Sequence, residues 1–391
     1  MFITIDSKRI EPIFPVTYAL KSDNLIRMHI PDGYLSPVTC AILYAAAAPF
    51  WAIALNRVKK ILNTRLVPLL SVFAAFSFVI MMFNIPLPGG TTGHATGIAI
   101  AAIVVGVWGS VLAISVALLI QALFFGDGGI TAFAANSFNM AIVGSFVAAA
   151  VYRIVANGAE LASTRRVVAA GLAGYAAINA AAFCASIEFG IQPMLFQDAS
   201  GAPLYAPYPL SIAVPAMMIG HITVAGLAEM IVTAGVVAYI QRTDISLLKL
   251  TAPDAPAAGV AETSGWRSTK ALWIGLAALM ILTPLGLLAA GTAWGEWSAE
   301  DFADPSAREQ IAAASLNQPA PTAPPEGLAQ LADVWTSPIP DYAPAFMNSQ
   351  EFGYILSAMF GTGIIILFFL LCGWIARIIG GRETSPTEDA N

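Results

Sequence analysis

The chain has 391 residues, of which 58% are hydrophobic and 11% charged, whereas soluble globular proteins carry about 25% charged residues. So few charges cannot cover a chain of this length with a water-compatible surface, so a soluble protein is excluded. Nucleic-acid binding is excluded as well, because the net charge is −6 and no basic tract is present. The three cysteines, Cys40, Cys184 and Cys372, are too few and too scattered for a disulfide framework or a thiolate metal site.

Apolar runs recur along the chain, and several have the roughly 20 residues that a membrane-spanning helix needs. In chain order the predicted spans are residues 38–55, 67–86, 95–125, 133–155, 167–189, 212–240, 271–290 and 353–378. The run 95–125 is long enough for one long helix or two short ones. The sequence therefore predicts a polytopic membrane protein.

Basic residues indicate which ends of the spans face the cytoplasm. Of the fourteen lysines and arginines after Arg27, thirteen lie in four groups between or after the spans, and short basic loops stay in the cytoplasm. The segment before the first span and the loop around His94 then lie outside. Going from the outer loop at His94 to the cytoplasmic basic group at Arg153 requires an odd number of membrane crossings. Residues 133–155 supply one, so residues 95–125 are predicted to cross twice, with a break near residues 106–109. The fold class is an all-α transmembrane helical bundle of about nine spans, seven plus two.

Two polar stretches divide the later part of the chain. The stretch before Trp266 is rich in Ala, Pro, Thr and Asp, which is typical of a cytoplasmic linker. Residues 291–351 hold nine carboxylates against one arginine, Arg308, and contain a proline- and alanine-rich tract. We expect this second stretch to be an extended, weakly structured loop on the outer side.

Only three histidines occur, His29, His94 and His221, and the predicted topology places all three at the outer face. If Met28 were the first residue, its amine, the next amide nitrogen and Nδ1 of His29 could chelate one cation in a plane, and His94 could supply a fourth nitrogen. Such a donor set suits Ni²⁺, Cu²⁺ and Co²⁺ better than Mg²⁺ or Ca²⁺. For His29 and His94 we therefore favour metal binding over an ordinary core role, and we expect His221 to start a span.

Other polar residues stand among small residues within the spans. Asp127 and Asn136 are candidates for orienting His94 or the N-terminal segment, because ligating histidines usually need a partner for the second ring nitrogen. Ordinary polar contacts between helices explain them equally well. Glu188 and Glu229 lie within or at the edge of predicted spans, where carboxylates are costly and often functional. Stabilising a helix junction and guiding the metal explain them equally well, so neither joins the primary ligand set.

Several of these motifs together resemble one family. They are residues 28–35, 88–94, 121–129 and 135–141, and residues 220–229 with His221 and Glu229. They are similar to the substrate-binding component of cobalt/nickel energy-coupling factor (ECF) transporters, the CbiM/NikM family, over about residues 28–242. The last two spans resemble, more loosely, the small accessory (CbiN/NikN-like) membrane subunit of such systems, here fused in one chain.

This resemblance implies a substrate-capturing subunit of an ATP-driven importer in the bacterial plasma membrane, not an enzyme. Met28, His29 and His94 would hold the metal at the outer face, with Asp127, Asn136 and His221 around them. The transported ion is Co²⁺ or Ni²⁺, and no cofactor is permanently bound. The partners would be a transmembrane coupling (T) subunit and cytosolic ABC-type ATPases. Square-planar nitrogen donors favour nickel, whereas fused chains of this appearance look more like the cobalt branch feeding cobalamin synthesis, which we prefer slightly.

Two other classes of protein are less well supported. An intramembrane metalloenzyme needs a catalytic glutamate beside paired histidines, as in His-Glu-x-x-His, and the sequence has no such spacing. A secondary transporter predicts internal repeats, and none is visible. The sequence also lacks a Walker A glycine-lysine loop, so ATP hydrolysis must reside on partners.

The sequence accordingly predicts five segments. Residues 1–27 lack the apolar stretch of a signal peptide, so we interpret them as a mis-assigned start or a segment removed before function. The remaining segments are a metal-binding membrane domain (28–242), a cytoplasmic linker (243–266), a two-span accessory domain with a long outer loop (267–382) and a polar tail (383–391).

Overall fold

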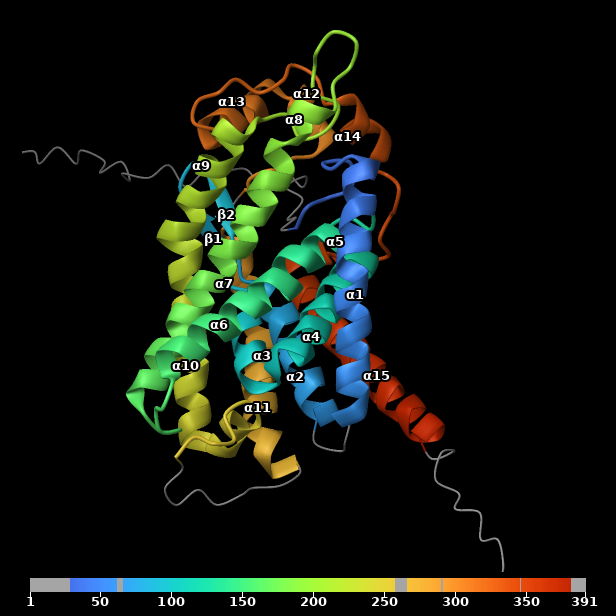
Figure 1. The fold of residues 1–391 in the computed structure, drawn as a ribbon. Helices are drawn as coiled ribbons and strands as arrows, with labels where there is room; N and C mark the ends of the chain where they lie inside the picture. The colour runs from blue at the N-terminus through green and yellow to red at the C-terminus, as the bar shows by residue number, and fades with distance from the viewer. Residues whose placement is uncertain (1–28, 62–65, 257–265, 290, 345, 381–391) are drawn as a thin grey trace, which may run out of the picture.

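The predicted all-α polytopic bundle is confirmed by the computed structural model, which describes residues 29–61, 66–256, 266–289, 291–344 and 346–380 (Figure 1). The helices of the first part are α1 (Pro37–Ile61), α2 (Leu66–Met81), α3 (Ile98–Val104), α4 (Gly106–Ile120), α5 (Phe133–Asn136), α6 (Ser145–Ala156), α7 (Thr164–Gly190), α8 (Gln192–Leu195), α9 (Leu210–Gly220) and α10 (Gly226–Thr243). Three π-helical turns accompany them: η1 (Gln121–Phe125), η2 (Ser137–Gly144) and η3 (His221–Ala225).

The later part of the chain is also helical. Its elements are the 3₁₀ turn η4 (Ile245–Leu250), α11 (Trp266–Leu282), the 3₁₀ turn η5 (Thr283–Leu288), α12 (Ala299–Ala303), α13 (Pro305–Ala314), α14 (Glu326–Leu331), the 3₁₀ turn η6 (Pro340–Tyr342) and α15 (Gln350–Gly380). The exception to the helical fold, among the described residues, is one antiparallel hairpin of two short strands, β1 (Ile85–Leu87) and β2 (Thr91–Gly93).

The predicted number of nine spans is not confirmed. Within the described residues, seven helices are long and apolar enough to cross a membrane. The apolar helix α2 is shorter than these, and α3 has only seven residues. Residues 95–125 nevertheless form two segments. The chain breaks at Gly106, whose φ of 80° is a left-handed conformation that glycine adopts without a steric penalty.

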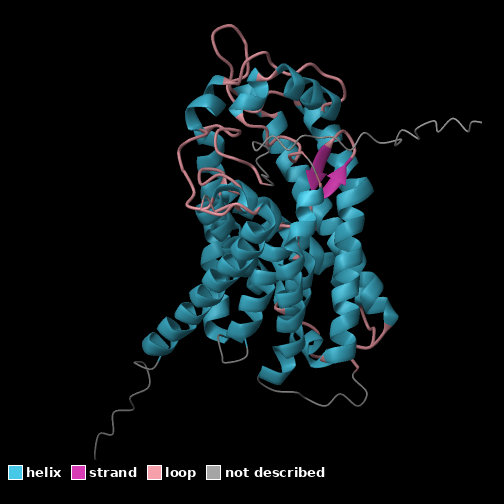
Figure 2. Ribbon diagram, turned by 180° about the vertical axis from the view of Figure 1, so that it is seen from behind, coloured by secondary structure: helices cyan, strands magenta, loops and turns pink. Residues whose placement is uncertain are grey.

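Two helices organise the packing of the bundle. Helix α7 packs against α6, α9 and α10, whereas α4 packs against α1, α2 and α3. The long helices α11 and α15 of the accessory part both pack on α2. The accessory spans therefore form part of the same bundle, as the two opposite views show (Figures 1 and 2).

The expectation of a weakly structured outer loop at residues 291–351 is wrong. Helices α12, α13 and α14 lie together at one end of the bundle, close to α8 (Figure 1). Ser298 and Asp301 form a capping box at the start of α12, and Asp304 caps α13. Phe302 and Ile311 are buried with relative exposures of 0% and 1%. The proline- and alanine-rich tract that suggested an extended loop thus lies between the capped helix α13 and α14, and both helices bury an apolar side chain, Ile311 and Leu328.

Candidate metal site

The hairpin β1–β2 positions His94. Pro86 pairs with Thr92 across the two strands, and the connecting turn contains Gly89 and Gly90, with φ values of 87° and 80° that favour glycine. His94 directly follows β2 and is 8% exposed. Its Nδ1 lies 3.0 Å from the carbonyl oxygen of Ala95. A carbonyl only accepts, so Nδ1 carries the proton and Nε2 keeps its lone pair.

A buried carboxylate fixes the chain immediately after His94. Glu229, in α10, is completely buried and accepts hydrogen bonds from the backbone nitrogens of Thr96 at 2.5 Å and Gly97 at 3.2 Å. Thr233, one turn later, donates to the same carboxylate. These are the otherwise unpaired amides that precede α3. Glu229 therefore stabilises a helix junction, and this junction sets the position of His94.

The N-terminal segment is tied to α5 and to the loop that precedes it. The side-chain amide of Asn136 both accepts from the backbone nitrogen of Ile30 and donates to its carbonyl, each at 3.1 Å. Asp32 accepts from the backbone nitrogens of Ile130 at 3.1 Å and Thr131 at 2.7 Å. A Cβ atom on Gly128 would lie 2.9 Å from Cβ of His29. The glycine-rich loop is therefore shaped to let the backbone before α1 approach closely.

His29 is held by Asp127 from the same loop. Nδ1 of His29 lies 2.8 Å from Oδ1 of Asp127, and both side chains are almost entirely buried. Nε2 of His29 is buried and has no hydrogen-bond partner among the described residues. Burial alone would raise the pKa of Asp127, but the hydrogen bonds that its carboxylate accepts from His29 and Tyr342 hold that pKa below its usual value. The carboxylate thus remains the acceptor, and Nε2 is the ring nitrogen left for another ligand.

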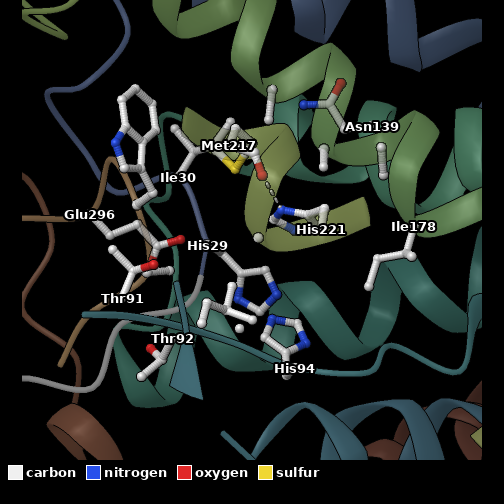
Figure 3. A pocket seen from close by; sticks show the side chains of 18 of the residues that line it. His29, Ile30, Thr91, Thr92, His94, Asn139, Ile178, Met217, His221 and Glu296 are labelled. Atoms are coloured by element: carbon white, nitrogen blue, oxygen red, sulfur yellow. Dashed lines mark hydrogen bonds between the residues drawn. The ribbon is translucent and has the colours of Figure 1, made fainter. Parts of the chain in front are cut away.

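All three histidines line one cavity of about 100 Å³ (Figure 3). The ring centroids of His29 and His94 are 5.3 Å apart, with the rings edge to face. His221 lies at the first position of the π-helical turn η3, and its Nδ1 donates to the carbonyl of Met217 at 2.9 Å. π-helical turns are rare and occur frequently at functional sites.

His221 does not start a span, contrary to the prediction. It lies inside the continuous helical run Leu210–Thr243. At a rise of 1.5 Å per residue, it is about 16 Å along the helix axis from Leu210. The predicted span 212–240 already placed His221 nine residues inside the span, and the structure starts the helix at Leu210, directly after Pro209. The cavity that His221 lines therefore lies inside the bundle and not at the end where this helix begins.

The remaining predicted residues divide as follows. Met28 lies outside the described residues. Asn136 contacts the backbone of Ile30 and not an imidazole, and Glu188 accepts from Asn139 at 2.8 Å.

No group of three or more His, Cys, Asp or Glu side chains is arranged to hold a metal ion within the part of the chain that the structure describes. The tridentate chelate expected from the sequence uses Nδ1 of His29, the atom that here donates to Asp127.

The accessory part contributes to the same cavity, which sequence reasoning missed. The backbone nitrogen of Thr92 donates to the carbonyl of Thr292 at 3.0 Å, beside the cavity-lining residues Trp294 and Glu296. Figure 3 shows Glu296 among the side chains that line the cavity together with His29. No local motif marks these residues, because the contact joins segments about two hundred positions apart.

Comparison with known proteins identifies the family of this chain. The sequence model described as "cobalt uptake substrate-specific transmembrane region" matches residues 29–247, which is more than half of the chain. The chain belongs to this family. A second model, the PDGLE domain, matches residues 268–378. The predicted membership, with a fused accessory region, is therefore confirmed, and this member of the family is a multi-pass membrane transport protein and not an enzyme.

Individual relatives support the same assignment. The fused nickel transport protein NikMN of Rhodobacter capsulatus is 57% identical over 340 residues, which cover 87% of this chain and 95% of that protein. The probable fused nickel transport protein LarMN of Lactiplantibacillus plantarum is 41% identical over 349 residues, covering 88% and 97%. A crystal structure described as a truncated transition metal transporter aligns with a TM-score of 0.52 at 48% identity, covering 55% of this chain and 99% of that one.

Proposed function

We propose that this chain captures Ni²⁺ on the outer side of the membrane for an ATP-driven ECF-type importer, with Co²⁺ as the alternative substrate. The observation that carries the proposal is the buried pair His29 and His94, whose rings meet at one cavity. A metal ion is the ligand that two convergent imidazoles recognise best, since each keeps a ring nitrogen with a lone pair.

The proposed donors are imidazole and backbone nitrogens. His29 binds through the ring nitrogen not bonded to Asp127, which is Nε2 in this structure, and His94 binds through Nε2. The amino group of Met28 is the further donor. Nitrogen donors select late first-row ions, whereas Mg²⁺ and Ca²⁺ prefer oxygen. Asp127 and the carbonyl of Ala95 accept from the other ring nitrogens, an arrangement that fixes the tautomer and ring orientation of metal-binding histidines.

The choice of nickel rests on relatives that share both parts of the chain. NikMN and LarMN align over nearly nine-tenths of this chain, and both are named nickel transport proteins. This similarity outweighs the slight preference for cobalt drawn from sequence appearance. The choice of nickel also agrees with the ligand-field preference of Ni²⁺ for a plane of nitrogen donors.

Energy for import is proposed to come from partners, namely a transmembrane coupling (T) subunit and cytosolic ABC-type ATPases. The chain carries no glycine-rich Walker A sequence that could bind nucleotide phosphates.

Uptake of radioactive nickel by cells expressing this chain with its coupling and ATPase subunits tests the function. We expect unlabelled Ni²⁺ to suppress uptake at lower concentration than Co²⁺, and Mg²⁺ to have no effect. Inactivating the Walker A lysine of the ATPases should abolish uptake. Equal uptake with inactive ATPases would contradict the energy source, and stronger competition by Co²⁺ would reverse the substrate assignment.

The role of Met28 makes a separate prediction. A free amino group at Met28 requires that residue to lead the mature chain, so mass spectrometry of active protein should find Met28 at the N-terminus. Inserting one glycine between Met28 and His29 should weaken Ni²⁺ binding about as much as losing an imidazole, because the amine moves away from the ring.

The matched control is a glycine inserted after Ala199, in an exposed turn outside the cavity. Normal affinity in the Met28–His29 insertion variant would remove the amine from the ligand set. In that case His29 would act as an isolated imidazole.

A further inference from the structure

A tyrosine of the accessory part is inserted beside the loop that holds His29. Tyr342, at the end of η6, is 1% exposed and stacks on Phe125 with ring centroids 4.7 Å apart and an interplanar angle of 20°. Two hydrogen bonds anchor this part of the chain. The backbone nitrogen of Ile339 donates to the carbonyl of Phe124, and the hydroxyl of Ser357 donates to the carbonyl of Tyr342, both at 2.9 Å.

The hydroxyl of Tyr342 is bonded to the carboxylate that holds His29. It donates to Oδ2 of Asp127 at 2.6 Å, while Oδ1 of the same carboxylate accepts from Nδ1 of His29 at 2.8 Å. Gln121 donates to the Tyr342 hydroxyl at 3.0 Å and lies 3.4 Å from Oδ2 of Asp127. Oδ1 of Asp127 thus accepts from His29 and Oδ2 accepts from Tyr342. The shorter of these two hydrogen bonds is the one from the accessory part.

The backbone that presents Tyr342 is strained. Asp341 and Tyr342 have φ values of 55° and 60°, so two consecutive residues other than glycine adopt the left-handed conformation. This conformation is disfavoured for L-residues and is maintained only where surrounding contacts impose it. Residues held in this way concentrate at binding and catalytic sites.

We propose that Tyr342 is a positioning residue of the metal site: its hydroxyl holds Asp127 in the orientation in which Asp127 fixes the imidazole of His29. The inference rests on the proposed function, in which the other ring nitrogen of His29 binds the metal. On this inference the accessory part contributes to metal affinity through two consecutive buried hydrogen bonds, one from Tyr342 to Asp127 and one from His29 to Asp127.

The alternative is that Tyr342 only fills space, and a neighbouring tyrosine provides the comparison. Tyr354 is equally buried, and its ring centroid is 5.4 Å from that of Tyr342. Its hydroxyl has no hydrogen-bond partner among the described residues. Tyr354→Phe therefore removes one hydroxyl from the same aromatic cluster without touching the bond to Asp127.

The test measures Ni²⁺ binding to the purified full chain in lipid nanodiscs. Loss of a residue that supports a metal ligand typically costs about 10–100-fold in affinity, so Tyr342→Phe should raise the Kd at least about tenfold. Tyr354→Phe should leave the Kd within about twofold. Absorption bands of bound Co²⁺ should shift in Tyr342→Phe and stay in place in Tyr354→Phe, because only the first variant changes how the His29 ring is held.

Two further variants separate failure of this inference from failure of the proposed function. Asp127→Asn should weaken binding, and adding Tyr342→Phe to it should cost little more, since both changes act through one contact. His29→Ala should abolish binding. If His29→Ala binds nickel normally, the proposed function is wrong. If it loses binding while Tyr342→Phe matches the wild type or Tyr354→Phe, the positioning role is wrong.

Discussion

Replacing either His29 or His94 with alanine should abolish uptake at trace nickel concentrations. Each change removes one imidazole from a small set of nitrogen donors. Complete structural zinc sites contribute about 10–16 kcal/mol, so losing one donor should cost several kcal/mol. Each 1.4 kcal/mol is about tenfold in affinity. The affinity of the purified chain, measured by equilibrium dialysis with radioactive nickel, should therefore fall by at least about a hundredfold in both variants.

His221→Ala is the matched control for these two variants. His221 lines the same cavity, but it is bonded through Nδ1 to its own helix and is not part of the pair whose rings meet. We expect it to weaken binding less than either of the other histidine variants. A larger loss with His221→Ala than with His94→Ala would replace the proposed pair with a different one.

Glu229→Ala should destabilise the protein and displace His94. The change removes the acceptor of the backbone nitrogens of Thr96 and Gly97, both of which are buried. Each buried group left unpaired costs about 1–3 kcal/mol, so the free energy of unfolding should fall by about 2–6 kcal/mol. Thermal unfolding of the detergent-solubilised protein measures this loss, and nickel affinity should fall in parallel.

Two conservative variants make this result specific. Glu229→Gln retains one accepting oxygen and should lose less stability than Glu229→Ala. Glu188→Gln changes another buried carboxylate, which accepts from the side chain of Asn139 rather than from the backbone after His94, and should lose less nickel affinity than Glu229→Ala. If Glu229→Ala kept both its stability and its nickel affinity, the junction would not set the position of His94.

Long apolar stretches and basic loops predicted much of the bundle, because membrane insertion depends on local composition. The same pattern placed His29 and His94 on one side, and their rings lie 5.3 Å apart. The break near Gly106 followed from the parity of crossings and from a glycine able to adopt a positive φ. These features depend on residues close together in sequence.

Features that depend on distant contacts could not be predicted in this way. The fold of helices α12 and α13 depends on burying residues such as Phe302 and Ile311, whereas the sequence there is dominated by proline, alanine and carboxylates. The bond between Tyr342 and Asp127 spans 215 positions. The start of the helix that carries His221 was predicted to within two residues, at 212 against Leu210, but hydropathy gave no sign that this histidine lines an internal cavity.

The helical run that continues from the π-helical turn His221–Ala225 to Glu229 places a constraint on chain length rather than on residue type. His221 faces the cavity, and Glu229 on the same helical run binds the backbone of Thr96 and Gly97, just after His94. A π-helical turn holds one residue more than an α-helical turn, and one residue corresponds to about 100° of rotation. Deleting one residue of the turn itself would let regular α-helix form and would keep Glu229 close to its present direction relative to His221, whereas deleting one residue of α10 between the turn and Glu229 would rotate Glu229 by about 100°. The segment that links the turn to Glu229 therefore tolerates changes of side chain more readily than a change in its number of residues.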